Sequence, residues 1–290
     1  MFKYGYELVE YCEKEKKCIS TVALEEEAQQ GDCTVQDVLD ELNKRVDIMN
    51  AACIRTLLEP TPSVSGLTGG DANRLYKYRK SSDTLMGETA LLGVDLALSC
   101  FEVNTSMGAI VACPTAGSCG IVPGALFAVA KKKNLNREAL LHAFATAGYI
   151  GMIIAGNATV AGAEGGCQAE CGSASAMAAA AIVQMCGGTP AQSLSAAAIA
   201  LKNVMGLVCD PVAGLVEIPC AKRNASGVTN AILSAELVLA GIDSMIPFDE
   251  VVGAMYKVGR MLPEELRETA RGGVAVTKTG LEHKKRVFGE

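Results

Sequence analysis

The sequence of 290 residues contains no tryptophan, and its aromatic content is only 4%. Proteins that bind single-stranded nucleic acid stack its bases on aromatic side chains, so this composition argues against such a partner. The net charge of −6 also argues against nucleic acid or an anionic membrane surface. Only two histidines are present and no two cysteines have the C-x-x-C spacing, so a structural zinc site is poorly supported.

Two further patterns are missing. No G-x-G-x-x-G fingerprint occurs, which argues against a dinucleotide-binding fold. Residues 1–7 (MFKYGYE) contain no apolar run ahead of their charges, so we expect no secretory signal and a cytoplasmic location. Twelve cysteines in a reducing compartment are not expected to form a disulfide framework, and most are predicted to be small core residues.

Two segments without any charged residue, 103–130 and 171–201, raise the question of a membrane span. Proline and glycine interrupt both, so neither offers the roughly 20 uninterrupted apolar residues that a span requires. Segment 143–163 is the closest candidate, but it contains several glycines and few large apolar residues. We interpret it as a buried helix of a soluble bundle, with a membrane span as the alternative.

The hydrophobic pattern is helical nearly throughout and predicts an all-α protein with a single domain. Thr34 is placed to cap a helix, and Asp37 three residues later completes a capping box. Thr189 is placed to cap a further helix over 191–205, with Pro190 in its first turn. Helices are also expected over 226–240, 249–261 and 264–270, with a short hairpin near 271–279.

Charge is distributed unevenly along this predicted domain, 1–290. We expect charged peripheral helices over 1–80, a motif-bearing core over 80–276, and a charged, frayed tail over 277–290. The middle of the chain, about 100–240, is rich in alanine and glycine, so its motif loops are predicted to lie buried at the centre.

Residues 113–123 (CPTAGSCGIVP) form the first motif, in which two prolines bracket glycines and hydroxyl residues. Such a turn directs backbone N–H groups and short hydroxyls inward, which suits a small carboxylate. An ordinary loop between buried helices is the alternative.

Three cysteines, Cys167, Cys209 and Cys220, lie in Gly/Pro-rich turns beside segments with little charge. A cytosolic protein would hold an iron–sulfur cluster in such a place. Three thiolates on a four-iron cluster would leave one iron without a protein ligand, and an open iron is a Lewis acid. Buried inert thiols are the alternative. Cys171 would share a helical face with Cys167.

The remaining cysteines outside the motifs are predicted to serve only in packing; they are Cys12, Cys18, Cys33, Cys53, Cys100 and Cys186.

Three carboxylates, those of Glu164, Glu170 and Asp210, lie beside the motif cysteines and need partners in so apolar a region. Lys222 and Arg223 follow Cys220 directly, and they either neutralise these carboxylates or hold a substrate carboxylate.

The two histidines offer no catalytic arrangement with a serine or cysteine. His142 has apolar neighbours and is predicted to be a satisfied core or rim residue, and His283 in the charged tail is predicted to be solvated.

Taken together, the motifs resemble the iron–sulfur L-serine dehydratases, specifically the α chain of the two-chain form. The resemblance runs from about residue 80 to residue 276. It is carried by residues 102–108 (EVNTSMG), 114–120 (PTAGSCG), 162–170 (GAEGGCQAE), 209–220 (CDPVAGLVEIPC), 222–225 (KRNA) and 267–273 (RETARGG).

The resemblance implies an all-helical catalytic domain that holds a [4Fe–4S] cluster on Cys167, Cys209 and Cys220. Cys171 stands where family members often carry an aliphatic residue, and it is either incidental or a competing ligand. Relatives with a single chain end in a cysteine behind the Gly-Gly segment. No cysteine follows Cys220 here, so the fourth iron is expected to be free for substrate.

The implied reaction converts L-serine to pyruvate and ammonia without pyridoxal. The substrate hydroxyl, alone or together with the carboxylate, is expected on the open iron. The loop Thr115, Ala116, Gly117 and Ser118 is expected to help hold the carboxylate, with Asn104 and Ser106 as neighbours. A base removes the α-proton, the β-hydroxyl leaves, and the resulting aminoacrylate tautomerises and hydrolyses.

Family members also use a smaller partner domain with a Ser-Ser-His-Thr-type segment. Residues 81–87 (SSDTLMG) look similar, but Asp83 replaces the histidine, so we assign them to the α chain. We therefore expect a separate smaller β chain in a hetero-oligomer. We expect this chain to supply the base, with local residues as secondary candidates. A cluster-dependent L-cysteine desulfidase and a non-catalytic iron–sulfur module are the alternative functions.

Overall fold

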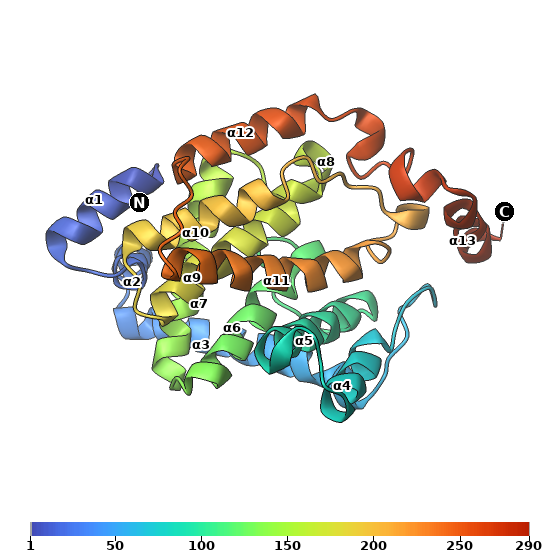
Figure 1. Ribbon diagram of the computed structural model, residues 1–290, viewed down its shortest axis with the longest axis horizontal. Helices are drawn as coiled ribbons and strands as arrows, with labels where there is room; N and C mark the ends of the chain where they lie inside the picture. Colours follow the sequence, from blue (N-terminus) through green and yellow to red (C-terminus); the bar gives the residue numbers. More distant parts are fainter. Residues whose placement is uncertain (1, 290) are drawn as a thin grey trace.

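The computed structural model describes residues 2–289, and every regular element within that range is a helix (Figure 1). The α-helices are α1 (Gly5–Glu15), α2 (Ile19–Gln30), α3 (Val35–Leu58), α4 (Asp71–Ser81), α5 (Gly87–Thr105), α6 (Ile121–Lys133), α7 (Arg137–Asn157), α8 (Gly162–Gly165), α9 (Ser173–Met185), α10 (Pro190–Asn203), α11 (Cys220–Leu239), α12 (Phe248–Met261) and α13 (Lys278–Phe288). Short turns are the 3₁₀ segments η1 (Ala116–Ser118), η3 (Val212–Gly214), η4 (Glu264–Leu266) and η5 (Gly273–Val276), and the π-helical η2 (Gln168–Gly172). The all-α prediction is confirmed.

Helix α9 forms the centre of the bundle and packs against α6, α7, α10 and α11. It is apolar on all sides and is buried over Ser173–Val183, as expected of a core helix. Its many alanines leave room for the neighbouring helices to approach closely. The alanine-rich helix at the centre is therefore buried, but the prediction of buried motif loops holds only in part, because Ala116 and Gly214 in those loops are exposed.

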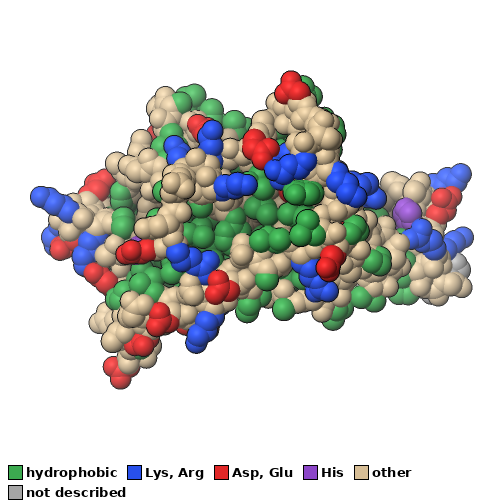
Figure 2. Space-filling model, turned by 90° about the horizontal axis from the view of Figure 1, so that it is seen from below, with side chains coloured by type: hydrophobic (Ala, Val, Ile, Leu, Met, Phe, Trp, Pro, Cys, Tyr) green, Lys and Arg blue, Asp and Glu red, His purple; other side chains and the backbone are tan. Residues whose placement is uncertain are grey.

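Figure 2 shows hydrophobic side chains across the middle of one face, with charged side chains around them. In Figure 1 the chain begins beside α1 at one end of the bundle and ends beside α13 at the other.

Local sequence signals explain where several helices begin. Thr34 Oγ1 accepts a hydrogen bond from the backbone N–H of Asp37 at 3.1 Å, and the Thr34 N–H donates to the Asp37 carboxylate at 2.9 Å. This is the predicted capping box of α3. Thr189 and Gln192 make the equivalent pair at the start of α10.

The carboxyl-terminal region differs from the prediction. Residues 271–279 form no hairpin; they contain η5 and the start of α13. The expected fraying is also wrong for 278–288, because Thr277 Oγ1 caps α13 by accepting from the Gly280 N–H at 3.1 Å. The helix expected over 264–270 is only the single turn η4, since Glu268 and Ala270 have positive φ.

Helix α7 contains most of the segment that raised the question of a membrane span. Among the described residues it is the one helix long and apolar enough to cross a bilayer, and 61% of its most apolar window is buried inside the protein. This burial agrees with the interpretation as a core helix.

Helices α5 and α6 cross so closely that their backbones touch. A Cβ atom at Gly124 would lie 2.6 Å from the carbonyl oxygen of Gly93, so only glycine fits. This contact holds the segment that precedes α6, with the predicted carboxylate loop, against the end of α5.

Candidate metal centre

Cys167 lies at the start of a π-helical turn, η2, which joins α8 to α9. The buried side chain of Gln168 fixes this turn: its Nε2 donates to the Met255 carbonyl at 3.0 Å, and its Oε1 accepts from the Gly206 N–H at 2.9 Å. Sequence patterns gave no signal for the π turn, because a single inserted residue hardly alters helical periodicity. Such turns occur frequently at functional sites.

Cys209 is held by a short parallel bridge to the segment after η4. Its N–H donates to the Leu266 carbonyl at 2.8 Å, and its carbonyl accepts from the Glu268 N–H at 2.7 Å. Cys220 is the first residue of α11, which begins six residues before the predicted start at 226, and its side chain is buried.

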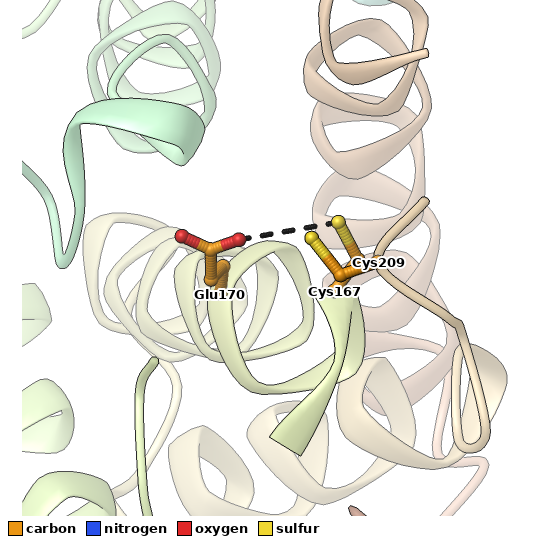
Figure 3. A group of neighbouring side chains, drawn as sticks. All are labelled: Cys167, Glu170 and Cys209. Carbon is orange, nitrogen blue, oxygen red and sulfur yellow. Dashed lines mark hydrogen bonds between the residues drawn. The ribbon is translucent and has the colours of Figure 1, made fainter. Parts of the chain in front are cut away.

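The thiols of Cys167 and Cys209 and a carboxylate oxygen of Glu170 all lie within 4.8 Å of one another (Figure 3). Two of the three predicted ligands therefore come together, with Glu170 as an unpredicted third member. Cys220 lies outside this group. Burial raises the pKa of the Cys220 thiol, and the negative charge of Cys167 raises it further. Cys220 is therefore close enough to Cys167 for their charges to interact.

The charges around Cys167 favour its thiolate. The pKa of Cys167 is lowered to about 3, first by the thiol of Cys171, then by that of Cys209, with a further contribution from Arg223. An Nη atom of Arg223 lies 3.3 Å from the Cys167 sulfur. Since the thiolate is the form that binds metals, this sulfur is prepared for a ligand role.

Arg223 and Lys222 have different partners. Arg223 donates to the Asp210 carboxylate and to the Val208 carbonyl, both at 2.8 Å, so it neutralises Asp210. Lys222 instead pairs with Asp71 of α4. Of the three carboxylates flagged in the sequence, only Asp210 has either of these cations as an ion-pair partner.

Asp210 also anchors the Gly-Gly segment. Its second oxygen accepts from the Val274 N–H at 2.7 Å. Gly273 has a φ of +59°, and any side chain there would overlap the Asp210 carboxylate. The motif at 267–273 therefore closes over the loop that carries Cys209.

The side chain of Glu170 is partly buried. Burial raises the pKa of Glu170 to about 7, the charge of Cys167 adds to the rise, and the Thr115 hydroxyl opposes it. Glu170 was noted in the sequence only as a carboxylate in need of a partner. Its position one helical turn after Cys167 is the signal that could have placed it in the site.

The predicted carboxylate loop reaches the same place. A Cβ at Gly117 would lie 3.4 Å from Glu170 Oε1 and 3.7 Å from Thr115 Oγ1, so Glu170 borders the loop. Asn104 Nδ2 donates to the Ala116 carbonyl at 3.1 Å. Ala116 is exposed.

Two of the predicted substrate contacts, Ser118 and Ser106, make hydrogen bonds within the protein. The Ser118 hydroxyl is buried and lies 3.1 Å from that of Thr115. The Ser106 hydroxyl donates to the Val103 carbonyl at the end of α5.

Asn224 was missed as a functional residue, although it lies inside one of the motifs. Its side chain donates to the Gly117 carbonyl at 2.8 Å and accepts from the Gly120 N–H at 3.0 Å. It stands one turn after Cys220 and so couples that cysteine's helix to the carboxylate loop.

The remaining cysteines and His142 lie apart from this site. Cys12, Cys53 and Cys100 are buried in the core, whereas Cys18 and Cys33 are exposed, so the packing prediction is wrong for those two. His142 is a rim residue, as predicted, and its Nδ1 lies 2.9 Å from the Ser20 hydroxyl.

The donors at this site fit a thiolate-bound metal group. Cysteine thiolates are the ligands that hold iron–sulfur clusters. As soft ligands, they favour iron–sulfur clusters, zinc and copper(I) over hard cations such as Mg²⁺. Gly162 keeps the space between the donors open, because a Cβ there would lie 2.5 Å from Glu170 Oε2 and 3.1 Å from the Cys209 sulfur.

Fold and site together define a class: an all-helical protein in which motif loops bring cysteine thiols and a carboxylate to one largely buried centre that could hold a metal. Within that class the chain belongs to the serine dehydratase alpha chain family, whose family model matches residues 13–275. The resemblance of the motifs is thereby confirmed.

Three relatives show how far the similarity extends. The chain is 51% identical over 289 residues to a probable L-serine dehydratase, alpha chain, of Bacillus subtilis (strain 168), covering 100% of this chain and 96% of the relative. It is 48% identical over 280 residues to the L-serine dehydratase, alpha chain, of Peptoniphilus asaccharolyticus, covering 97% and 96%. It is 35% identical over 286 residues to an L-serine dehydratase of Helicobacter pylori (strain ATCC 700392 / 26695), covering 95% of this chain but 62% of that longer protein.

Proposed function

We propose that this chain is the α subunit of an iron–sulfur-dependent L-serine ammonia-lyase, which converts L-serine to pyruvate and ammonia. Membership of the family and the names of its alpha-chain relatives support the lyase. The observation that carries the cofactor is the meeting of the Cys167 and Cys209 thiols with Glu170 beside the carboxylate loop.

In this proposal Cys167, Cys209 and Cys220 hold a [4Fe–4S] cluster. The bound cluster would supply a Lewis acid that makes the β-hydroxyl a better leaving group. Arg223 has a structural part, because it neutralises Asp210 and stabilises the charge of Cys167 at once.

The loop Thr115, Ala116, Gly117 and Ser118 binds the substrate carboxylate in this proposal. In this proposal the Thr115 hydroxyl and the backbone N–H of the exposed residue Ala116 are the hydrogen-bond donors, and the buried Ser118 hydroxyl shapes the turn. Asn104 positions the loop through the Ala116 carbonyl, and Ser106 secures the end of α5 beside it.

We infer that a separate smaller β chain supplies the base that removes the α-proton, in a cytoplasmic hetero-oligomer. The nearer of the two histidines in sequence, His142, is engaged with Ser20 on α2. The longer Helicobacter pylori relative extends well beyond its match to this chain, which supports a second component of the complete enzyme.

The ligand assignment is tested by Cys209→Ser in protein purified without oxygen together with its partner chain. We expect loss of the visible absorption, of bound iron and sulfide, and of pyruvate formation together, because one thiolate in three is removed. Cys33→Ser, at an exposed cysteine, is the matched control and should retain all of them.

Full activity of Cys209→Ser would contradict the assignment. Turnover of L-serine and L-cysteine on the same wild-type preparation separates the lyase from a desulfidase. Turnover of neither, with a cluster that serine leaves spectrally unchanged, would indicate a non-catalytic module.

A further inference from the structure

Glu170 stands between the two parts of the proposed active site. One side of its carboxylate borders the carboxylate loop at Gly117, and Oε2 lies 4.0 Å from the Cys167 sulfur on the other side. Figure 3 shows the side chain extended toward the two cysteines. A ligand that reaches from the loop to the sulfurs therefore has to pass Glu170.

The protein itself provides no cationic partner for this carboxylate. Across residues 2–289, no lysine, arginine or histidine nitrogen lies within 4.0 Å of Glu170. The two cations of this region are already engaged, Arg223 with Asp210 and Cys167, and Lys222 with Asp71.

The surroundings of Glu170 are instead negative. Cys167 and Glu268 both act unfavourably on its carboxylate charge, and Arg223, which is already engaged with Asp210 and Cys167, offsets them only in part. A partly buried carboxylate in such surroundings is stabilised by a positive group, and a ligand is the remaining source of one.

The α-ammonium of an amino acid bound in this site would lie close to Glu170. The ammonium is attached to the carbon that joins the carboxylate to the hydroxyl-bearing side chain. When the loop holds the carboxylate and the hydroxyl points toward the sulfurs, the ammonium lies along the wall between them.

We propose that Glu170 binds the α-ammonium of the substrate and thereby selects α-amino acids over hydroxy acids that lack the amine. This inference rests on the proposed function and adds a specificity-determining residue to it. Because a hydrogen bond between charged groups contributes strongly, removing the carboxylate's charge should weaken amine-bearing ligands selectively.

The test uses the cluster-loaded enzyme with its partner chain and two probes, each lacking one substrate group. L-Alanine has the carboxylate and ammonium without the hydroxyl; 3-hydroxypropionate has the carboxylate and hydroxyl without the ammonium. Calorimetric titration of Glu170→Gln should show L-alanine binding weakened by about 10- to 100-fold. Binding of 3-hydroxypropionate, bound iron and visible absorption should stay at wild-type values.

Two further variants accompany it. Glu164→Gln makes the same chemical change at an exposed position of the same segment, and it should bind both probes as the wild type does. Glu170→Asp keeps the charge and should retain part of the preference for L-alanine. The KM for L-serine should rise in Glu170→Gln by a factor similar to that for L-alanine.

Equal weakening of both probes in Glu170→Gln, or loss of its iron, would show a ligand or structural role and overturn the inference. Unchanged L-alanine binding and unchanged KM would overturn it too. So would a selective loss in Glu268→Gln with none in Glu170→Gln. The proposed function is judged separately, by pyruvate formation in the wild type.

Discussion

Cys167 and Cys171 differ in what surrounds their sulfur atoms. The pKa of Cys167 is lowered by neighbouring thiols and Arg223, whereas the pKa of Cys171 is raised by its contact with Cys167 and by full burial. Cys171 is therefore a hydrogen-bond partner of the Cys167 sulfur. We infer that it supports a proposed ligand without being one.

Substitution separates these two roles. Cys171→Ala should keep its bound iron, sulfide and visible absorption after anaerobic purification, while Cys167→Ala should lose them. Iron and sulfide analysis per chain is the measurement. A Cys171→Ala protein that contains no iron would show that Cys171 is a ligand.

The buried pair of Arg79 and Asp95 is the second feature at the residue scale. Their side chains are 2% and 0% exposed, and the Arg79 Nε lies 2.5 Å from the Asp95 carboxylate. Removal of one partner would leave a buried charge without compensation, so Arg79→Met should lower the free energy of unfolding by about 3–5 kcal/mol.

The loss should also depend on pH. Burial raises the pKa of Asp95 to about 6, and removal of Arg79 raises it further. A folded-state pKa above the unfolded value means that the folded protein binds more protons, so stability falls as pH rises through that range. Denaturant unfolding should therefore show a larger loss near pH 8 than near pH 5, with exposed Lys77→Met in the same helix as the control. A loss independent of pH would contradict this account.

At the scale of elements, the crossing of α5 and α6 depends on glycine. A methyl group at Gly124 would lie 2.6 Å from the Gly93 carbonyl oxygen and 3.0 Å from the Ala97 Cβ, and a helix backbone cannot move aside cheaply. Gly124→Ala should therefore destabilise the protein by about 1–3 kcal/mol.

Gly148 on α7 is the matched control, because nothing lies within 4 Å of a Cβ added there. Gly148→Ala should stabilise the protein by about 0.4–1 kcal/mol through the lower entropy of the unfolded chain. Chemical unfolding of both variants measures the contrast. Equal effects of the two substitutions would contradict the close crossing.

The starts of helices could be predicted where a capping residue near in sequence determines them. Thr34 with Asp37, and Thr189 with Pro190, mark helix starts that the structure contains, because a cap bonds backbone groups within its own turn. The region around η4 and η5 could not be predicted in this way. Its path is set by the contacts of Cys209 with Leu266 and of Asp210 with Val274, which join segments distant in sequence.

At the scale of the whole molecule, we propose that the base comes from the β chain. The α chain expressed alone should bind iron but form little pyruvate from L-serine, and co-expression with its partner chain should restore the activity. A coupled pyruvate assay on both preparations is the measurement. Equal activity of the isolated chain would show that the base lies within residues 2–289.

The sequence by itself determined the helical character, the caps and the identity of the motif cysteines, because each depends on neighbouring residues or on residue type. Only the tertiary structure decided which groups meet. It placed Glu170 beside Cys167 and Cys209, assigned Arg223 to Asp210 and Lys222 to Asp71, and used Asn224 to hold the carboxylate loop. The physical reason is that these contacts join loops far apart in the chain, and helix packing around α9 brings them together.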